Sequence, residues 1–142
     1  MSPKPKHIDY EKELNPAQLE AVMFDDGPLL VIAGAGSGKT RTLTYRVARL
    51  VEADVPPAAI LLLTFTRKAS AEMLTRACRL LDNRCGKVSG GTFHSFANAS
   101  LRRYAAVCGF NSGFSIMDRA DAESLIGMVK KELGISSKKR AL

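Results

Sequence analysis

The stretch that decides the fold is Leu29-Leu30-Val31-Ile32-Ala33-Gly34-Ala35-Gly36-Ser37-Gly38-Lys39-Thr40. Its first four residues are apolar and lie between glycine-containing segments, a pattern that predicts a short buried strand. The glycines that follow allow a tight turn, and the apolar spacing after Lys39 predicts a helix that begins there. A strand, a glycine-rich turn and a helix in this order are typical of a phosphate-binding loop, or P-loop.

The chemistry of the loop fits a nucleotide. Glycines let backbone N–H groups curl around phosphate oxygens, and the helix N-terminus adds a positive dipole end. We expect Lys39 to reach the β- and γ-phosphates and the Thr40 hydroxyl to bind Mg²⁺. The pattern G-x-x-x-x-G-K-[ST] has a glycine where Ala33 stands, which alanine can replace if its φ is negative. The alternative is a glycine-rich turn with an incidental lysine. The expected ATP-binding residues of the loop are Ala33, Gly34, Ala35, Gly36, Ser37, Gly38, Lys39 and Thr40.

Further elements are predicted on both sides of the loop. Asn15-Pro16 is a strong helix start, because Asn15 can cap and proline fits the first helical position. That helix should end near the turn at 25–28. Downstream, strands are expected at 60–65 and 87–92, and helices over 73–81, over 93–105 with Gly109 as the C-cap, and after Asp118. This alternation predicts an α/β domain with a parallel sheet flanked by helices.

Composition bounds the possible functions. The chain has 142 residues, a net charge of +7 and a pI near 9.6. A basic surface attracts polyanions, and nucleic acid is the leading candidate, although a solvated face is the plain alternative. No apolar run is long enough to span a bilayer, and no secretion signal follows the basic N-terminus. The cysteines lack C-x-x-C spacing, so we expect reduced thiols in a cytoplasmic protein without a membrane partner.

A P-loop enzyme also needs a carboxylate at a strand end to hold Mg²⁺ through water. The candidate of that shape is Asp118, after Phe114-Ser115-Ile116-Met117. The run is short and a helical pattern follows it. We therefore interpret Asp118 as a helix cap rather than as the metal ligand.

Four motifs then follow one another in order. They are Leu14-Asn15-Pro16-Ala17-Gln18, the loop at 33–40, Thr64-Phe65-Thr66-Arg67-Lys68-Ala69-Ser70-Ala71-Glu72-Met73 and Gly91-Thr92-Phe93-His94-Ser95-Phe96. Together they resemble the UvrD/Rep/PcrA family of superfamily 1A DNA helicases. The resemblance runs from about residue 14 to the stretch at 114–121, and it implies a RecA-like P-loop NTPase fold.

The resemblance implies roles for two further residues at the nucleotide. Gln18 resembles the Q-motif glutamine, whose side-chain amide reads the donor and acceptor edge of adenine. The alternative is that Gln18 helps to cap its own helix. Arg41 resembles the arginine that lies beside the nucleotide, although a solvated helix arginine is also possible. ATP and Mg²⁺ are the implied cofactors.

The resemblance also implies a single-stranded DNA site. Thr64, Phe65 and Thr66 are similar to motif Ia, in which hydroxyls contact phosphate and an aromatic ring stacks on a base. Core packing is the alternative for Phe65. The commonest family form has asparagine where Arg67 stands and alanine where Ser70 stands, and Arg67 and Lys68 could add phosphate contacts. Motif Ib supplies the remaining expected DNA-binding residues, Thr92, His94 and Ser95.

The family's Asp-Glu pair, arginine fingers and second RecA-like domain match nothing in this chain. We therefore expect residues 1–108 to be the first, incomplete part of RecA-like domain 1A. Residues 109–142 are expected to begin the helical insertion, subdomain 1B. The implied whole protein is an ATP-dependent 3′–5′ DNA translocase, with DNA-repair or replication proteins as candidate partners. The alternatives are a small P-loop kinase and a non-catalytic nucleic-acid-binding P-loop module.

Overall fold

The computed structural model describes residues 7–25, 27–111 and 113–135. The chain forms two compact units, which divide between Ser100 and Leu101. The first unit carries the P-loop sequence and both strands. The expected turn at 25–28 includes Asp26, which lies outside the described residues.

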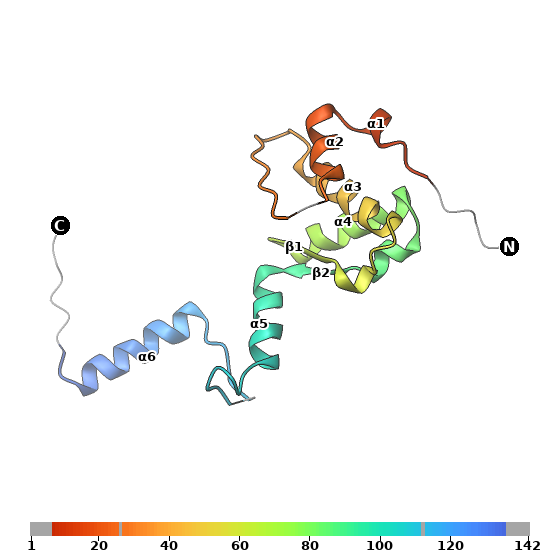
Figure 1. Ribbon diagram of the computed structural model, residues 1–142. Helices are drawn as coiled ribbons and strands as arrows, with labels where there is room; N and C mark the ends of the chain where they lie inside the picture. Colours follow the sequence, from red (N-terminus) through yellow and green to blue (C-terminus); the bar gives the residue numbers. More distant parts are fainter. Residues whose placement is uncertain (1–6, 26, 112, 136–142) are drawn as a thin grey trace. The chain divides into compact units, whose positions relative to one another are not determined.

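A βαβ unit forms the centre of the first unit. Strand β1 (Leu61–Thr64) pairs in parallel with β2 (Ser89–Thr92), and Leu61 aligns with Ser89 and Thr64 with Thr92. Helix α4 (Arg67–Leu80) connects the two strands and packs against both of them (Figure 1). Parallel strands need such a crossover connection. The α/β class and both predicted strands at 60–65 and 87–92 are therefore confirmed, with β2 starting two residues later than expected.

Three helices precede this unit. They are α1 (Tyr10–Glu13), α2 (Pro16–Met23) and α3 (Lys39–Glu52). The 3₁₀ turns η1 (Pro57–Ala59) and η2 (Asn83–Lys87) lie before β1 and β2. Helix α2 packs on α3, and α3 packs on α4, so the helices are layered outward from the sheet (Figure 1). The helix starts predicted at Asn15-Pro16 and Lys39 are confirmed.

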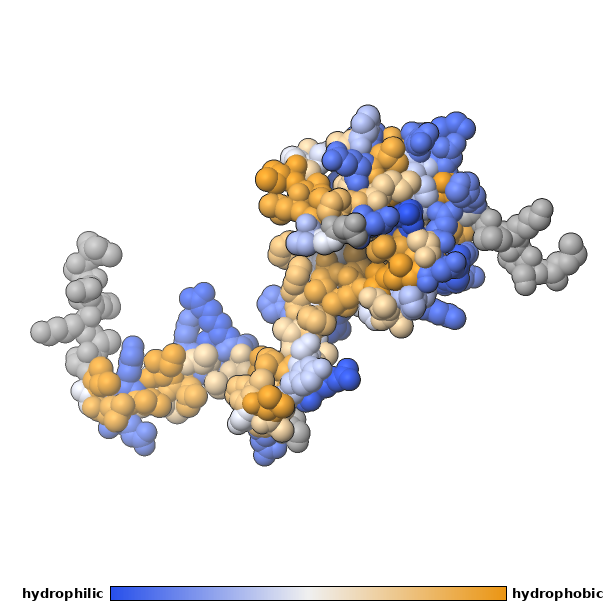
Figure 2. All heavy atoms as spheres, viewed as in Figure 1, coloured by the Kyte–Doolittle hydropathy of each residue, from blue (hydrophilic) through white to orange (hydrophobic). Residues whose placement is uncertain are grey.

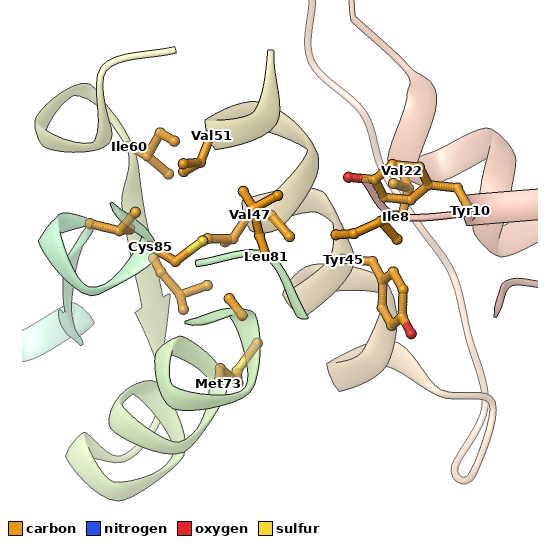
Figure 3. Packing of buried hydrophobic residues seen from close by; sticks show 14 of the residues in the cluster. Ile8, Tyr10, Val22, Tyr45, Val47, Val51, Ile60, Met73, Leu81 and Cys85 are labelled. Atoms are coloured by element: carbon orange, nitrogen blue, oxygen red, sulfur yellow. The ribbon is translucent and has the colours of Figure 1, made fainter. Parts of the chain in front are cut away.

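The core lies between α2, α3, α4 and η2. Val22 and Val51 are each 1% exposed, and the Cys85 side chain is fully buried. Burial raises the pKa of the Cys85 thiol to about 11, so this thiol stays protonated at neutral pH. Figure 3 shows Val51 of α3 beside Ile60, the residue directly before β1, and Val22 of α2 beside Ile8 and Tyr10 at the other end of the cluster. Burial of this apolar surface is the main stabilising term for the unit.

The prediction of a strand at residues 29–32 is wrong. These residues have no strand conformation, and Leu30 and Ile32 are 83% and 91% exposed. A strand requires backbone partners on a neighbouring strand, and no described segment pairs with this one. Figure 2 shows hydrophobic side chains on the surface where this segment runs.

Helix α5 (Phe93–Arg103) continues across the division into the second unit. It ends before Tyr104, earlier than predicted, and turns lead to Gly109, which has a φ of +74°. The Arg102 guanidinium lies over the Phe114 ring at 4.9 Å, and Phe110 packs on the same ring.

Helix α6 (Arg119–Glu132) completes the second unit. The Asp118 side chain accepts a hydrogen bond from the Asp121 amide at 2.9 Å, which confirms its interpretation as a helix cap. The apolar residues of α6, including Leu125 and Ile126, are exposed. In the described part of the chain, no helix has the length and apolarity needed to cross a bilayer.

Candidate nucleotide and nucleic-acid site

The glycine-rich loop forms a tight turn that leads into α3. Gly36 and Gly38 have φ values of +78° and +85°, which L-residues with side chains rarely adopt. The Ser37 hydroxyl donates to the Gly34 carbonyl oxygen at 2.8 Å and closes the turn. Asp54 is the one described non-glycine residue with a positive φ, so Ala33 has the negative φ that an alanine there requires.

Gly38 is the N-cap of α3 and makes no side-chain cap hydrogen bond. The N–H groups of the first turn therefore have no side-chain acceptor, and the dipole of a 14-residue helix points its positive end at the loop. Lys39 and Thr40 lie in this first turn. Such an N-terminus is suited to an anion.

The Lys39 ammonium lies against its own loop. Its Nζ atom donates to the carbonyl oxygens of Ala33 at 2.9 Å and Gly34 at 2.6 Å. These contacts place the cation on the inner side of the turn. An ammonium has three donors, and the contacts use two of them. Both the charge and a donor therefore remain for an anion held by the loop.

Gln18 connects α2 to the loop and also caps its own helix. The Asn15 side-chain oxygen accepts from the backbone N–H of Gln18 at 2.9 Å, and the Gln18 Oε1 atom accepts from the backbone N–H of Asn15 at 3.3 Å. This reciprocal pair is a capping box. At its other end, the Gln18 Nε2 atom donates to the Ser37 carbonyl oxygen at 3.0 Å. The capping role and a place beside the loop are therefore both present.

The Arg41 side chain contacts Glu13 and Tyr45. Its guanidinium donates to the Glu13 carboxylate at 2.8 Å and to the Glu13 carbonyl oxygen. It also lies 4.9 Å from the centre of the Tyr45 ring. The buried Tyr45 hydroxyl donates to the same carboxylate at 2.8 Å, and burial, together with this bond, raises the pKa of Tyr45. Arg41 thus connects α3 to the end of α1.

Two residues near the P-loop, Glu13 and Arg46, were not predicted from the sequence. Glu13 is 28 positions from Arg41, and no local pattern indicates that pairing. Arg46 is the second: its Nη1 atom donates to three carbonyl oxygens at the end of α2, those of Ala21 at 2.9, Val22 at 3.2 and Phe24 at 2.6 Å. A cation at a helix C-terminus satisfies carbonyls that have no intrahelical partner. Arg46 therefore fixes the helix that carries Gln18 on the helix that carries Lys39.

A second group of predicted residues gathers where the two strands end. Thr64 and Thr92 are register partners, and each is the last residue of its strand. Phe65 and Phe93 follow them directly, and their ring centroids are 6.2 Å apart. The carboxyl ends of parallel strands are where open α/β sheets place ligands. The sequence analysis did not include Phe93 among the site residues. Its place beside Phe65 follows from the register of two strands that are far apart in the sequence.

The hydroxyls of this group serve different partners. Thr64 Oγ1 donates to the Thr66 carbonyl oxygen at 2.7 Å, and Ser95 Oγ donates to the Thr92 carbonyl oxygen at 2.8 Å. A hydroxyl has one proton, so these two use theirs within the chain. Thr66 Oγ1 instead accepts from the Ala69 backbone N–H at 3.1 Å as the N-cap of α4, and in the described part of the chain its own proton has no acceptor.

Three basic or titratable side chains lie at the starts of the two helices. Arg67 and Lys68 are the first two residues of α4, and His94 is the second residue of α5. All three are exposed. The structure thus brings the motif Ia and motif Ib residues together at one edge. Among the residues it describes, no hydrogen bond, ion pair or ring contact joins this group to the P-loop group.

An α/β unit with an uncapped helix N-terminus after a glycine turn, a lysine and a threonine defines a class of phosphate-loop proteins. The match to known families is more specific. Residues 14–141 match the family described as the UvrD/REP helicase N-terminal domain, and the chain belongs to that family. The resemblance noted from the four motifs is thereby confirmed.

The chain is similar to bacterial proteins named ATP-dependent DNA helicase PcrA. It is 48% identical over 127 residues to the protein of Bacillus subtilis (strain 168), a match that covers 89% of this chain and 17% of the relative. The protein of Staphylococcus aureus (strain Mu50 / ATCC 700699) is 46% identical over 127 residues, with the same coverage. That of Staphylococcus epidermidis is 46% identical over 129 residues, 90% of this chain and 18% of the relative. The chain therefore spans less than a fifth of these relatives' length.

Proposed function

We propose that this chain is the ATP-binding N-terminal part of an ATP-dependent DNA helicase, a 3′–5′ single-stranded DNA translocase. Residues 1–108 are assigned to an incomplete RecA-like domain 1A, and residues 109–142 to the start of helical subdomain 1B. The family match and the likeness to helicases named PcrA support this assignment. We expect the whole protein to act in the cytoplasm, with DNA-repair or replication proteins as partners.

The observation that carries the nucleotide assignment is the uncapped N-terminus of α3 with Lys39 inside the turn. We assign the loop at 33–40 to the phosphates of ATP, with Lys39 at the β- and γ-phosphates. Gln18 lies beside this loop and is assigned to adenine. Arg41 is assigned a place beside the nucleotide: its Nη2 atom serves Glu13, and a guanidinium has further N–H donors on its other nitrogens.

Mg²⁺ fits the same end of the helix. Thr40 follows Lys39 in the first turn of α3, and its hydroxyl is an oxygen ligand of the kind that Mg²⁺ prefers. When bound, the ion neutralises charge that develops on the phosphates during transfer. The protein's own part is to hold the phosphates with backbone N–H groups and to present Lys39. Thr40 is the residue of this loop that would hold the ion.

We assign the edge formed by Thr64 and Thr92 to single-stranded DNA. Phe65 offers a stacking face, Arg67 and Lys68 provide cations at the start of α4, and His94 provides a ring with hydrogen-bonding nitrogens at the start of α5. Thr66 is the best hydroxyl donor to a phosphate, because its hydroxyl accepts from Ala69 and donates to no other group among the residues that the structure describes. Thr64, Thr92 and Ser95 shape the edge through their own hydrogen bonds.

Isothermal calorimetry with ATP and GTP tests the nucleotide assignment. The unmodified chain should bind ATP more tightly than GTP. Lys39→Ala should weaken ATP binding by roughly 10- to 150-fold, since hydrogen bonds to charged groups contribute about 1.5–3 kcal/mol. Lys87→Ala, at an exposed lysine of η2, is the matched control. Equal affinity for ATP and GTP would contradict the adenine assignment.

Fluorescence anisotropy with labelled single-stranded DNA tests the second assignment. Binding should be nearly independent of sequence and should weaken strongly as salt is raised, because phosphate contacts dominate. Replacing Arg67 and Lys68 together by alanine should reduce the affinity and the salt dependence. Replacing Lys130 and Lys131 of α6 together by alanine is the charge-matched control. Unchanged affinity after loss of Arg67 and Lys68 would exclude this edge as the DNA site.

A further inference from the structure

Two phenylalanines occupy equivalent places at the ends of the paired strands. Phe65 follows Thr64, Phe93 follows Thr92, and these threonines are register partners. The ring centroids are 6.2 Å apart and the ring planes are tilted by 55°. Phe65 is 94% exposed and Phe93 is 55% exposed. The pair therefore presents aromatic surface to solvent at the edge assigned above to DNA.

The two rings differ in how they are held. Phe65 lies between the last residue of β1 and the N-cap of α4, and almost none of its surface is covered. Phe93 begins α5 and is about half covered. Within the described part of the chain, the Phe65 ring contacts the ring of Phe93. An aromatic side chain without neighbours samples several rotamers, whereas a tilted ring contact favours a subset of them.

We propose that Phe93 is a positioning residue: it holds the Phe65 ring in an orientation whose free face stacks on one base of single-stranded DNA. The inference rests on the proposed DNA-binding function and adds a residue to it. A ring that is already oriented loses less conformational freedom when the base binds. Arg67 and Lys68, directly after the Phe65-Thr66 step, provide the positive charge that a strand with a stacked base requires for its phosphates.

The angle between the two ring planes argues against a base that stacks between both rings. Such a sandwich requires nearly parallel planes, and these planes are tilted by 55°. A base that stacks on Phe65 alone does not require parallel ring planes, because it uses a face of Phe65 that Phe93 does not cover. The proposal thus assigns stacking to Phe65 and support to Phe93, a division that a double-mutant cycle can measure.

The experiment uses the full chain, a labelled oligothymidylate and a strand of equal length whose bases are replaced by abasic sites. The abasic strand keeps the phosphates and cannot stack. Anisotropy should show a preference for oligothymidylate of roughly 5- to 150-fold, the range for stacking on an aromatic side chain. Phe65→Ala should abolish this preference. Phe93→Leu should reduce it several-fold in the native background and have no effect in the Phe65→Ala background.

Binding to the abasic strand should be the same for all variants, because the phosphate contacts are intact. Phe93→Tyr keeps the ring and should retain the preference, which also serves if Phe93→Leu folds poorly. Phe110→Leu, at a 53% exposed ring that pairs with Phe114 in the other unit, is the matched control. It should change nothing.

Each contrary outcome has a distinct meaning. Additive losses from Phe65→Ala and Phe93→Leu would show that Phe93 contacts the base itself and would overturn the positioning role. An unchanged preference in Phe93→Leu would reduce the ring pair to simple packing. Salt-dependent binding without a base preference would overturn this inference and leave the proposed DNA site standing. Absence of binding to both strands would overturn the proposed DNA site and this inference together.

Discussion

The Gln18 Nε2 atom donates to the Ser37 carbonyl oxygen at 3.0 Å, so a residue of α2 contacts the P-loop directly. The end of the Gln18 side chain also lies close to the next residue, Gly38. A Cβ atom at Gly38 would lie 2.6 Å from Gln18 Nε2, and the φ of Gly38 is +85°. The backbone conformation therefore favours glycine at this position, and a larger residue would also displace the end of the Gln18 side chain.

This relationship leads to a prediction for Gln18→Ala. The variant should lose affinity for ATP more than for GTP, because the amide that matches the adenine edge is removed. Calorimetry with both nucleotides measures the ratio. Asn15→Ala is the control for capping: it removes the acceptor of the capping box and leaves the Gln18 side chain in place. It should cost about 0.5–2 kcal/mol of stability and leave the ATP-to-GTP ratio unchanged. A lowered ratio in both variants would assign the effect to helix capping.

Ser70→Ala should stabilise the first unit. Ser70 is 3% exposed, and among the described residues its Oγ atom has no hydrogen-bond partner. A buried, unpaired hydroxyl costs about 1–3 kcal/mol, and alanine also has the higher helix propensity, by at most about 0.7 kcal/mol. Urea unfolding should therefore show a gain of more than about 1 kcal/mol. A gain within the propensity difference alone would mean that the hydroxyl is satisfied in solution.

Gly90→Ala should destabilise the same unit. A Cβ atom at Gly90 would lie 2.6 Å from Ser70 Oγ and 2.7 Å from Leu74 Cδ1, at the contact between β2 and α4. Overpacking of this kind costs about 1–3 kcal/mol. Gly127→Ala, where a Cβ would meet nothing within 4 Å, is the control. Ser70→Ala should recover only part of the loss in the double variant, because Leu74 still obstructs the new methyl group. Full recovery would show that Ser70 alone sets the spacing.

The local features of the P-loop region could be predicted from the sequence, because they depend on neighbouring residues. The capping box of Asn15 and Gln18 and the helix that begins at Lys39 follow from local spacing. The contact between Gln18 and Ser37 spans 19 positions, and the pairing of Arg41 with Glu13 spans 28. Such contacts depend on how helices pack, which no periodicity in the sequence encodes.

The strands also show the difference between local sequence patterns and contacts between distant residues. The run at 29–32 has the apolar composition of a buried strand, yet the structure leaves it exposed and unpaired. Its composition predicts how well it would pack once paired, whereas a neighbouring strand decides whether it pairs. The run at 61–64 has such a neighbour in β2 and forms the predicted strand. The ring pair of Phe65 and Phe93 could not be predicted for the same reason, since it follows from that register.

The stability of the first unit should fall in acid partly through Asp82. The Arg84 side chain and its backbone N–H donate to the Asp82 carboxylate and lower its pKa. A carboxyl whose pKa is lower in the folded chain contributes stability above its unfolded pKa of about 3.9, and this stability is lost as pH falls through the folded value. Asp82→Asn keeps the cap acceptor and removes the charge, so its unfolding free energy should change less as the pH falls from about 6 to below the unfolded pKa of about 3.9.

Chemical denaturation at a series of pH values measures this difference. Glu20→Gln, at an exposed carboxylate of α2, is the control and should keep the pH dependence of the unmodified chain. If Asp82→Asn and the unmodified chain lose equal stability in acid, the ion pair with Arg84 contributes nothing to folding.

The last prediction is that this chain by itself binds ATP and DNA but neither hydrolyses ATP at a useful rate nor unwinds DNA. Hydrolysis requires a carboxylate that positions Mg²⁺ and water, and a cation that neutralises the departing γ-phosphate. The carboxylate with the best sequence context, Asp118, is occupied as the cap of α6. An arginine finger contributes about 10³–10⁵ in rate, and the Arg41 guanidinium is bound to Glu13. A steady-state ATPase assay with saturating single-stranded DNA measures the outcome, with Lys39→Ala as the control. Turnover near the 1–10³ s⁻¹ of ordinary enzymes, lost in Lys39→Ala, would require a complete site in this chain. Asp118→Asn, which preserves the cap, would then show whether that carboxylate holds the metal.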